Sequence, residues 1–391
     1  MKNQTKAIDT PFGRKDAYGS LSMPIYHTAA YEFDTAADMA DAFTGRVIAP
    51  DYSRVMNPTV MYLEDKVKVT TGAIGVMAMS SGMAAISNTL MTLAAQGKNI
   101  VTSRHMFGNT FSLITQSLKR FGVEARTCDL LDLDAVERLV DDNTCCIFLE
   151  IITNPQMEVA DLTALADIAH RHNIPLVADT TVIPFTEFSA KSLGVDIELV
   201  SSTKYLSGGA TTLGGLIIGY EGSEQFVHQM KNEMLFNFGA YMTPHVAYMQ
   251  SIGFETLDAR YRLQSANTLE LARRLQTVKS IKRVNYVGLE DNPFHDIATR
   301  QFGPTAGCMM TIDLNDKQAC YDFINSLQLV RRATNLFDNR SLAIHPASTI
   351  FGNFTDEERA AMDVLDTTVR LSVGLEDVDD IFDDIRQAAE R

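Results

Sequence analysis

The sequence lacks both an apolar run long enough to cross a membrane and an excess of positive charge. Its 391 residues include 34 Lys and Arg against 49 Asp and Glu, a formal net charge of −15. No stretch reaches the roughly 18 continuous apolar residues of a membrane span, and the N-terminal stretch has no apolar segment typical of a signal peptide. Because nucleic acids and acidic membranes attract basic surfaces, the charge argues against a general binder of either. We therefore expect a cytoplasmic protein with no nucleic-acid or membrane partner.

Cysteine is also scarce, and its arrangement argues against a disulfide framework. The sequence has five cysteines, with no CxxC pair. They are Cys128, Cys145, Cys146, Cys308 and Cys320. An odd count in this arrangement favours free thiols and a reducing compartment, and three of the five lie in apolar stretches that predict burial. The pair His170 and His172 indicates a helix end, so that no metal site is expected.

No internal repeat or low-complexity linker divides the chain, so its organisation must come from hydrophobic patterning. At roughly 100–200 residues per domain, the length predicts about two or three domains. Residues 1–55 are weakly periodic and read as an extended arm, which can reach across a neighbouring subunit or equally lie as an ordinary surface segment. We expect a large domain over residues 56–245 and a C-terminal α+β domain over residues 246–391.

In the large domain, short apolar runs alternate with helical patterns. The expected strands cover residues 74–79, 99–103, 124–129, 145–151, 175–180, 197–202 and 213–219. The expected helices cover residues 81–95, 110–122, 132–140 and 161–172, the last two opening on an aspartate that can cap them. This alternation predicts an α/β fold with a mostly parallel seven-stranded sheet covered on both faces. Ligands of such sheets bind at the carboxyl ends of the strands.

The C-terminal part begins with a long helical stretch and then mixes strands with helices. The expected strands cover residues 308–314, 329–335, 341–347 and 368–377. The expected helices cover residues 316–327, a segment opening with the capping box of Thr355 and Glu358, and a last acidic helix. This mixture predicts the smaller α+β domain.

The stretch SSTKYLSGG places a lysine, Lys204, at the carboxyl edge of an expected strand. A desolvated lysine has a lowered pKa and can attack a carbonyl carbon to form a Schiff base. Taken alone, however, Lys204 is equally compatible with a solvated turn. Two further residues change that balance.

Asp179 and Gly82 lie at the ends of two other expected strands. An acid at Asp179 can pair with the protonated pyridine nitrogen of pyridoxal phosphate (PLP). Gly82 opens a helix whose free N–H groups can bind a phosphate. Each residue has a plain alternative, a helix cap for Asp179 and a tight turn for Gly82. Together with Lys204 at one sheet edge, they favour a PLP site.

The order of the motifs resembles the Cys/Met-metabolism family of PLP-dependent enzymes over nearly the whole chain. This family includes cystathionine γ-synthase, cystathionine γ-lyase, methionine γ-lyase and O-acylhomoserine sulfhydrylases. The motifs are YSRVMNPT, SSGMAAI, MFGNT, TNPQMEV, VADTT, SSTKYLSGG, IHPAST and RLSVGLED. The resemblance implies PLP fold type I, as in aspartate aminotransferase.

The resemblance also implies a role for each matching residue. Lys204 would bind the cofactor covalently and move protons between substrate carbons, while Asp179 would pair with the pyridine nitrogen. The remaining cofactor contacts would be Gly82, Met83, Ser201 and Thr203 at the phosphate, Asn154 at the phenolic oxygen, Thr181 beside Asp179, and Phe107 stacked on the ring. Arg370 would clamp the substrate carboxylate, helped by Asn335.

Two implied contacts cross a subunit boundary. Tyr52 and Arg54 would reach the phosphate of a neighbouring subunit, and Tyr52 is also a candidate catalytic proton donor. The smallest functional unit would then be a homodimer, and members of the family are usually tetramers.

The chain departs from the family pattern at four places. Phe107 stands where most members carry a tyrosine, and Asn335 stands where a serine often helps to hold the substrate carboxylate. Thr180 alters the usual DNT, and EIITNP lacks the first proline of the usual ETPSNP. In addition, methionine γ-lyases typically carry a cysteine where Asn109 stands.

Phe107 is the informative departure, because a phenol can protonate a departing thiolate. A carboxylate, the conjugate base of an acid with a pKa of about 4, leaves without a proton, whereas a thiol has a pKa of about 8.5. We therefore expect γ-replacement on an O-acylhomoserine by sulfide or a small thiol, giving homocysteine or methionine. The alternatives are methionine or cystathionine γ-lyase, with Tyr52 as the proton donor, and cystathionine γ-synthase. A PLP-binding protein without catalysis is disfavoured because Lys204, Asp179 and Arg370 are all retained.

Overall fold

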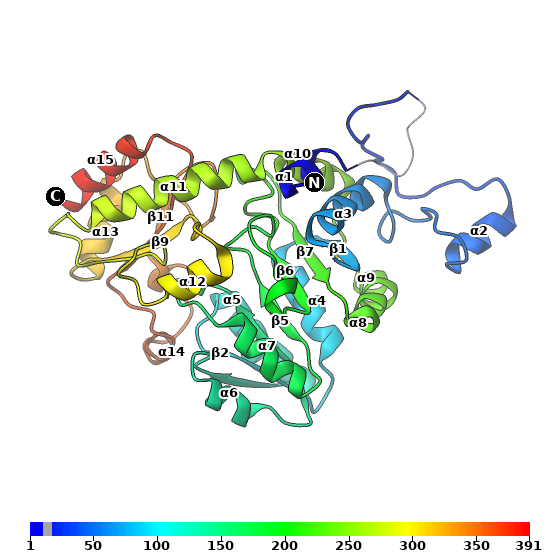
Figure 1. The fold of residues 1–391 in the computed structure, drawn as a ribbon, viewed down its shortest axis with the longest axis horizontal. Coiled ribbons are helices and arrows are strands. Elements are labelled where there is room, and N and C mark those ends of the chain that lie inside the picture. Colours follow the sequence, from blue (N-terminus) through cyan, green and yellow to red (C-terminus); the bar gives the residue numbers. More distant parts are fainter. Residues whose placement is uncertain (11–17) are drawn as a thin grey trace.

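The computed structural model describes residues 1–10 and 18–391, and it contains two β-sheets (Figure 1). The larger sheet has seven strands in the order β1-β7-β6-β5-β4-β2-β3. They are β1 (Gly75–Met79), β2 (Asn99–Ser103), β3 (Glu124–Cys128), β4 (Thr144–Glu150), β5 (Leu176–Asp179), β6 (Ile197–Val200) and β7 (Gly215–Gly219). All seven expected strands are therefore confirmed. The sheet is mostly parallel, but β7 runs antiparallel to both β1 and β6.

Helices cover both faces of this sheet, as the unbroken burial of its central strands requires. Within β4, Phe148 packs toward one face, whereas Ile147 and Leu149 pack toward the other. The first face carries α4 (Gly82–Leu93), α5 (Gly108–Ser112), η1 (Leu113–Ser117), η2 (Leu118–Phe121), α8 (Glu224–Gln229), η4 (Met230–Met234) and α9 (Leu235–Phe238). The second face carries α3 (Pro58–Thr71), α6 (Leu133–Leu139) and α7 (Leu162–Arg171), and η3 (Lys191–Leu193) follows α7 and β5 in the chain.

The smaller sheet has five strands in the order β10-β11-β12-β9-β8. They are β8 (Arg283–Asn285), β9 (Met309–Asp313), β10 (Arg331–Arg332), β11 (Leu342–Ile344) and β12 (Thr368–Ser372). Helix α10 (Pro244–Glu255) contacts α1 and α3 and leads into this part. The helices of this part are α11 (Leu257–Leu275), α12 (His295–Phe302), α13 (Lys317–Ser326), η5 (Pro346–Ser348), α14 (Asp356–Ala361) and α15 (Val378–Ala389). The capping box of Thr355 and Glu358 at the start of α14 is confirmed.

Two expected elements differ from the structure. The strand expected over residues 329–335 shrinks to β10, because N–H groups before it are bound by Asp384 and carbonyls after it by Arg370. The helix expected over residues 110–122 divides into α5, a π-helical turn η1 and a 3₁₀ turn η2.

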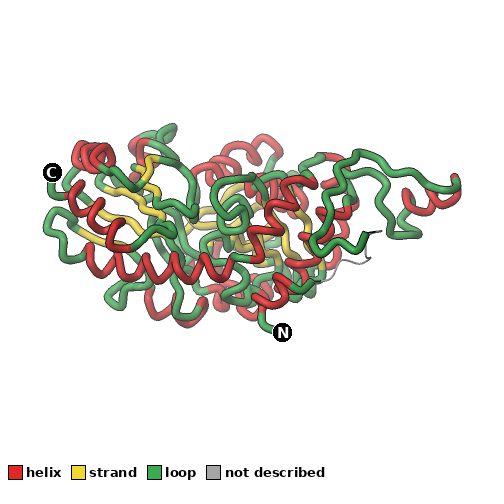
Figure 2. Tube along the Cα trace, turned by 90° about the horizontal axis from the view of Figure 1, so that it is seen from above, coloured by secondary structure: helices red, strands yellow, loops and turns green. Residues whose placement is uncertain are grey.

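The N-terminal segment combines a docked helix with a projecting arm. Helix α1 (Asn3–Ile8) contacts α3 and α10, and Asn3 donates to the carbonyl oxygen of Thr186 at 2.9 Å. Further along, the chain carries α2 (Ala36–Phe43) far from both sheets (Figures 1 and 2). No residue of α2 is buried, so this helix lies on the surface of the single chain.

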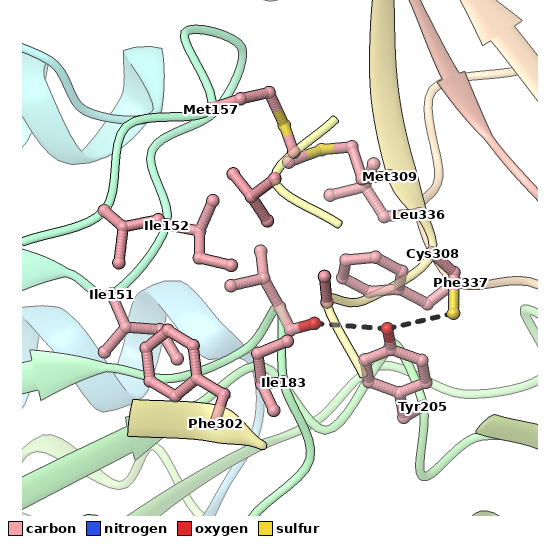
Figure 3. Packing of buried hydrophobic residues seen from close by; sticks show 14 of the residues in the cluster. Ile151, Ile152, Met157, Ile183, Tyr205, Phe302, Cys308, Met309, Leu336 and Phe337 are labelled. Atoms are coloured by element: carbon pink, nitrogen blue, oxygen red, sulfur yellow. Dashed lines mark hydrogen bonds between the residues drawn. The ribbon is translucent and has the colours of Figure 1, made fainter. Parts of the chain in front are cut away.

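The cores of the two sheets join in one continuous apolar cluster (Figure 3). Tyr205 of the large domain stacks on Phe337 of the C-terminal part, with ring centroids 4.2 Å apart. The Tyr205 hydroxyl donates to the carbonyl oxygen of Val182 at 3.2 Å and lies 3.4 Å from Sγ of Cys308. The two domains are thus packed together directly beside residue 204.

The five cysteines are all free, and Cys146, Cys308 and Cys320 are buried. Cys145, in the apolar run CCIFLE, is half-buried, as is Cys128. Among the described residues, no helix is both long and apolar enough to span a membrane.

Candidate active site

The candidate site lies where β4, β5 and β6 end side by side. Glu150 is the last residue of β4 and pairs in register with Asp179, the last residue of β5. Ser201 follows the end of β6 directly. Because these strands are parallel, the sheet brings their carboxyl ends to one edge, where ligands bind in this architecture.

Lys204 is held in a tight turn just beyond β6. Its backbone N–H donates to the carbonyl oxygen of Ser201 at 3.1 Å. The next residue, Tyr205, is buried between the two domains. The backbone at Lys204 is therefore fixed on one side by the sheet and on the other by the domain contact.

The Lys204 amine is prepared to act as a nucleophile. Burial and the nearby charge of Arg370 lower the pKa of Lys204 to about 8, although Asp179 opposes this shift. Nζ donates to Oδ1 of Asn335 at 3.0 Å, and Nδ2 of Asn335 donates to Oδ2 of Asp338 at 3.2 Å. Asp338 therefore orients the amide so that its oxygen faces the lysine. Sequence reasoning placed Asn335 at the substrate carboxylate and did not identify Asp338.

Asp179 is a half-buried acid with two donors from a single neighbour. Thr181 donates its backbone N–H at 2.9 Å and its hydroxyl at 2.5 Å to Oδ1 of Asp179. Burial raises the pKa of Asp179, while the bonds from Thr181 and the charge of Lys204 oppose the rise. Thr181 also accepts the backbone N–H of Ser201 at 2.8 Å. The expected neighbours Asp179, Thr181 and Ser201 thus form one network.

Gly82 and Ser201 approach so closely that no side chain fits between them. A Cβ atom at Gly82 would lie 2.7 Å from Cβ and Oγ of Ser201. Gly82 is the first residue of α4, and Ser81 caps this helix by accepting the N–H of Ala84 at 3.0 Å. The N–H groups of Gly82 and Met83 have no intrahelical acceptor, so this cradle can bind a phosphate.

Arg370 is a buried cation that lacks an anionic partner among the described residues. It lies on β12 and is 2% exposed. Its NH1 group donates to Oδ1 of Asn154 at 3.3 Å, and its NH2 group to the carbonyl oxygen of Asn335 at 3.2 Å. Nε of Arg370 has no hydrogen-bond partner among the described residues. Burial lowers the pKa of Arg370 to about 9. Such an unpaired guanidinium can bind an incoming carboxylate.

Asn154 has a donor left for the cofactor. Because Oδ1 of Asn154 accepts from Arg370, the amide N–H₂ is the part that can reach a phenolic oxygen.

The hydroxyl of Thr203, which was expected to bind the cofactor phosphate, contacts the backbone of Gly214 in this structure. Its Oγ1 lies 3.2 Å from the carbonyl oxygen of Gly214 and 3.0 Å from the Gly214 nitrogen.

Phe107 is anchored through its backbone by Glu150, which sequence reasoning missed. The N–H of Phe107 donates to Oε1 of Glu150 at 2.7 Å. Burial and the charge of Asp179 raise the pKa of Glu150 to about 8. The available signal was a single carboxyl at the end of an apolar strand, CCIFLE.

Tyr52 and Arg54 are not brought together with the other site residues within one chain. Both lie just before α3, and Tyr52 is 44% exposed. The Arg54 guanidinium donates to the carbonyl oxygen of Phe236 and lies 5.4 Å from the Tyr52 ring centroid. Their expected place in a neighbouring subunit's site therefore stays a prediction.

This set of groups fits PLP. The cofactor needs an amine for its aldehyde, an acid for its pyridine nitrogen and N–H donors for its phosphate. Lys204, Asp179 and the Gly82 cradle supply these three in turn. Among the described residues, no three His, Cys, Asp or Glu side chains gather as metal ligands.

Comparison with known proteins gives the same assignment. A family model described as Cys/Met metabolism PLP-dependent enzyme matches residues 4–390. An L-methionine γ-lyase of Pseudomonas putida is 35% identical over 387 residues, covering 98% of this chain and 96% of the relative. An O-succinylhomoserine sulfhydrylase of Pseudomonas aeruginosa is 35% identical over 375 residues, covering 95% of this chain and 91% of the relative.

The fold matches solved structures over the full length. A Campylobacter jejuni structure assigned as an O-acetylhomoserine (thiol)-lyase has a TM-score of 0.96 and 32% identity, covers 100% of both chains and carries a pyridoxyl-lysine phosphate. The structure of metB from Corynebacterium glutamicum has a TM-score of 0.91 and 28% identity, covering 100% of this chain and 98% of the other. PLP fold type I is thereby confirmed. Matches of this extent show that the chain belongs to the PLP-dependent enzymes of cysteine and methionine metabolism, with PLP as its cofactor.

Proposed function

We propose that this enzyme catalyses γ-replacement on an O-acylhomoserine, most simply O-acetylhomoserine, with sulfide or a small thiol. The Cγ–O bond breaks, a Cγ–S bond forms, and the products are acetate with homocysteine or methionine. The observation that carries the proposal is Phe107, a side chain without a phenol, at the start of α5, where its backbone N–H is bound by Glu150 at the end of β4. The resemblance of the fold to an O-acetylhomoserine (thiol)-lyase supports it.

The missing phenol affects the two candidate leaving groups differently. A departing thiolate is basic and gains from a positioned proton donor, which contributes ~10²–10⁴-fold to rate. A carboxylate is about four pKa units less basic and leaves without a proton. Phe107 therefore disfavours loss of methanethiol from methionine more than loss of acetate.

The other site residues would bind the substrate, move its protons and hold the cofactor. When bound, PLP supplies a ring that accepts electrons and stabilises negative charge on the substrate carbons. Arg370 binds the substrate α-carboxylate through its unpaired guanidinium. Lys204 takes the proton from Cα and moves it, while Asn335 is placed to accept a hydrogen bond from the free amine at 3.0 Å. Asp179 holds its negative charge at the pyridine nitrogen.

We also propose a homo-oligomer, at least a dimer and in full a tetramer, in the cytoplasm. Tyr52 is 44% exposed, and Arg54 bonds the carbonyl oxygen of Phe236 and not another site residue. The chain before them projects away from both sheets with α2 (Figure 2). Apolar side chains of this arm are exposed, among them Phe43 at 64% and Ile48 at 81%. A second copy of the chain would cover them and receive Tyr52 at its phosphate site.

A second candidate is methionine γ-lyase, which yields 2-oxobutanoate and ammonia with methanethiol. The identity of 35% to the Pseudomonas putida enzyme favours it. In that case Tyr52 of a neighbouring subunit would supply the proton that Phe107 does not.

Turnover of four substrates side by side tests the proposal. Purified enzyme with PLP is given O-acetylhomoserine or O-succinylhomoserine with sulfide, and methionine or cystathionine alone. We expect homocysteine from O-acetylhomoserine at the highest kcat/KM. Brisk methanethiol release from methionine without homocysteine formation would reverse the ranking of the two candidates.

A further inference from the structure

His105 is a buried imidazole enclosed between carboxylates, and none of the roles above uses it. It lies two residues before Phe107 and is 2% exposed. Nδ1 lies 2.5 Å from Oε2 of Glu158, and Nε2 lies 2.8 Å from Oδ2 of Asp363. Its backbone N–H donates to Oγ of Ser103 at the end of β2. The ring therefore joins two distant chain segments, while its backbone is fixed at the end of β2.

The Glu158 contact reaches the turn that carries Asn154. Glu158 closes this turn, because its N–H donates to Oγ1 of Thr153 and its carbonyl oxygen accepts the N–H of Thr153, both at 3.0 Å. Asn154 follows Thr153 directly. A bond from His105 to Glu158 thus holds the Asn154 turn against the segment that leads into Phe107.

The Asp363 contact crosses to the C-terminal domain. Asp363 lies between α14 and β12, the strand that carries Arg370. The neighbouring residue bonds the Asn154 turn directly, since Nε2 of Gln156 donates to the carbonyl oxygen of Met362 at 2.6 Å. The segment before β12 is thereby attached to the Asn154 turn through Met362 and to the Phe107 segment through Asp363.

The two carboxylates select the charged form of the ring. A neutral imidazole has one N–H, so it can donate to Glu158 or to Asp363 but not to both. Burial lowers the pKa of His105, but the hydrogen bonds and charges of Glu158 and Asp363 outweigh burial and raise it, against the nearby charge of Arg104. Nε of Arg104 lies 3.2 Å from Nε2, so a neutral ring would accept from Arg104 and lose Asp363.

We propose that His105 is a positioning residue whose imidazolium joins the Phe107 turn, the Asn154 turn and the segment before β12. It sets the distance between the cofactor contacts of the large domain and Arg370 of the C-terminal domain. The proposal rests on the proposed cofactor roles of Phe107 and Asn154, and it is independent of which substrate the enzyme takes.

The sign of the pH dependence follows from the raised pKa. The contribution of the imidazolium is complete below the ordinary pKa of histidine and is lost as the pH rises through the raised value. We therefore expect the imidazolium's contribution to PLP affinity, and to the visible circular dichroism of bound PLP, to decline over that range in the wild-type enzyme, in addition to the pH dependence that Lys204 causes in wild type and variant alike. His105→Gln should abolish this transition, because a carboxamide does not titrate.

The first variant is His105→Gln in the full-length protein. Its one amide nitrogen can take the place of Nδ1 or of Nε2 but not of both, and it is uncharged, so one charge-assisted bond is lost. We expect PLP to bind to the apoenzyme about tenfold more weakly at neutral pH, because hydrogen bonds to charged groups contribute more than neutral ones. The PLP dissociation constant and visible circular dichroism are measured from pH 6 to pH 9.

A second variant avoids any change in the buried ring. Asp363 has a 59% exposed side chain, and Asp363→Asn suits its positive φ of 52°. Like His105→Gln, Asp363→Asn should weaken PLP binding, and it should reduce the change of PLP affinity with pH. The matched control is His170→Gln, which removes a His–Asp contact of 2.9 Å at the opposite edge of the same sheet.

Three outcomes are distinguishable. A changed PLP affinity and a lost pH transition in both test variants, but not in the control, support the role of His105. Wild-type behaviour of Asp363→Asn, with His105→Gln no different from the control, overturns it. Failure of the wild-type protein to bind PLP at Lys204 overturns the proposed function instead.

Discussion

At the residue scale, the chemistry depends on three charged side chains that meet between the two sheets. Lys204 and Asp179 lie at the carboxyl edge of the large sheet and are half-buried, whereas Arg370 lies on β12 of the smaller sheet and is buried. Each charge would be costly if it were unpaired. Lys204 meets this cost with a lowered pKa of about 8 and a bond to Asn335. Arg370 keeps an unpartnered Nε among the described residues, which marks the place of a substrate anion.

Capture of PLP by the apoenzyme should depend on pH through Lys204. Because only the neutral amine attacks an aldehyde, the capture rate should rise with pH and level off above about 8. Stopped-flow absorbance after mixing apoenzyme with PLP measures this rate. Borohydride reduction followed by peptide mapping should label Lys204 alone, whereas Lys66, a buried lysine paired with Glu255 at 2.7 Å, serves as the unlabelled control. Labelling at any residue other than Lys204 would contradict the assignment.

Replacing Phe107 with tyrosine should move the enzyme toward elimination. The new phenol can protonate a departing thiolate, so we expect kcat/KM for methionine to rise about tenfold, with little change for O-acetylhomoserine. The control is Phe111→Tyr, which adds a phenol to the same helix where Phe111 packs against Phe354. A drop in methanethiol release on Phe107→Tyr would show that the ring position does not supply the proton.

At the element scale, hydrophobic alternation located the seven strands of the large sheet but not all the helices. Helix α3 was missed, although Asn57 caps it, Pro58 begins it and Gly72 ends it with a φ of 72°. Its apolar stripe is weak because Lys66 and Thr70 are buried within it. A helix with polar residues on its buried face cannot be found by periodicity, whereas its terminal residues did carry the signal.

Helix α15 binds the backbone before β10 through one of its acidic side chains. The buried carboxylate of Asp384 accepts the N–H groups of Gln328, Leu329 and Val330, each at 2.8 Å. Asp384→Ala leaves all three without an acceptor, and we expect a loss of about 3 kcal/mol in unfolding free energy. Thermal unfolding of the holoenzyme measures the shift. The neighbouring Asp383→Ala should cost about 0.5 kcal/mol, because its pair with Arg386 is exposed; equal effects would contradict the role of Asp384.

At the scale of the whole molecule, the arm before α3 decides whether one chain makes a complete site. If Tyr52 and Arg54 serve a neighbouring subunit, two differently defective chains should complement each other. Lys204→Ala and Arg54→Ala are each expected to be nearly inactive. After unfolding and refolding together at equal concentration, random pairing should restore about a quarter of the wild-type sites.

Activity of the mixed sample measures this complementation, and each variant refolded alone is the control. Recovery to that level supports sharing of the site between subunits. A mixture no more active than the separate variants would show that Arg54 acts within its own chain.

The sequence by itself determined the large α/β sheet, the lysine, its partner acid and the glycine cradle. These features depend on the order of residues along the chain. Each of these site residues follows a strand, and parallel strands bring their carboxyl ends to one edge of the sheet. Tertiary structure alone showed Asp338 behind Asn335, Glu150 behind Phe107, and His105 between Glu158 and Asp363. These contacts join residues up to 258 positions apart, and no periodicity along the chain encodes a distance between two domains.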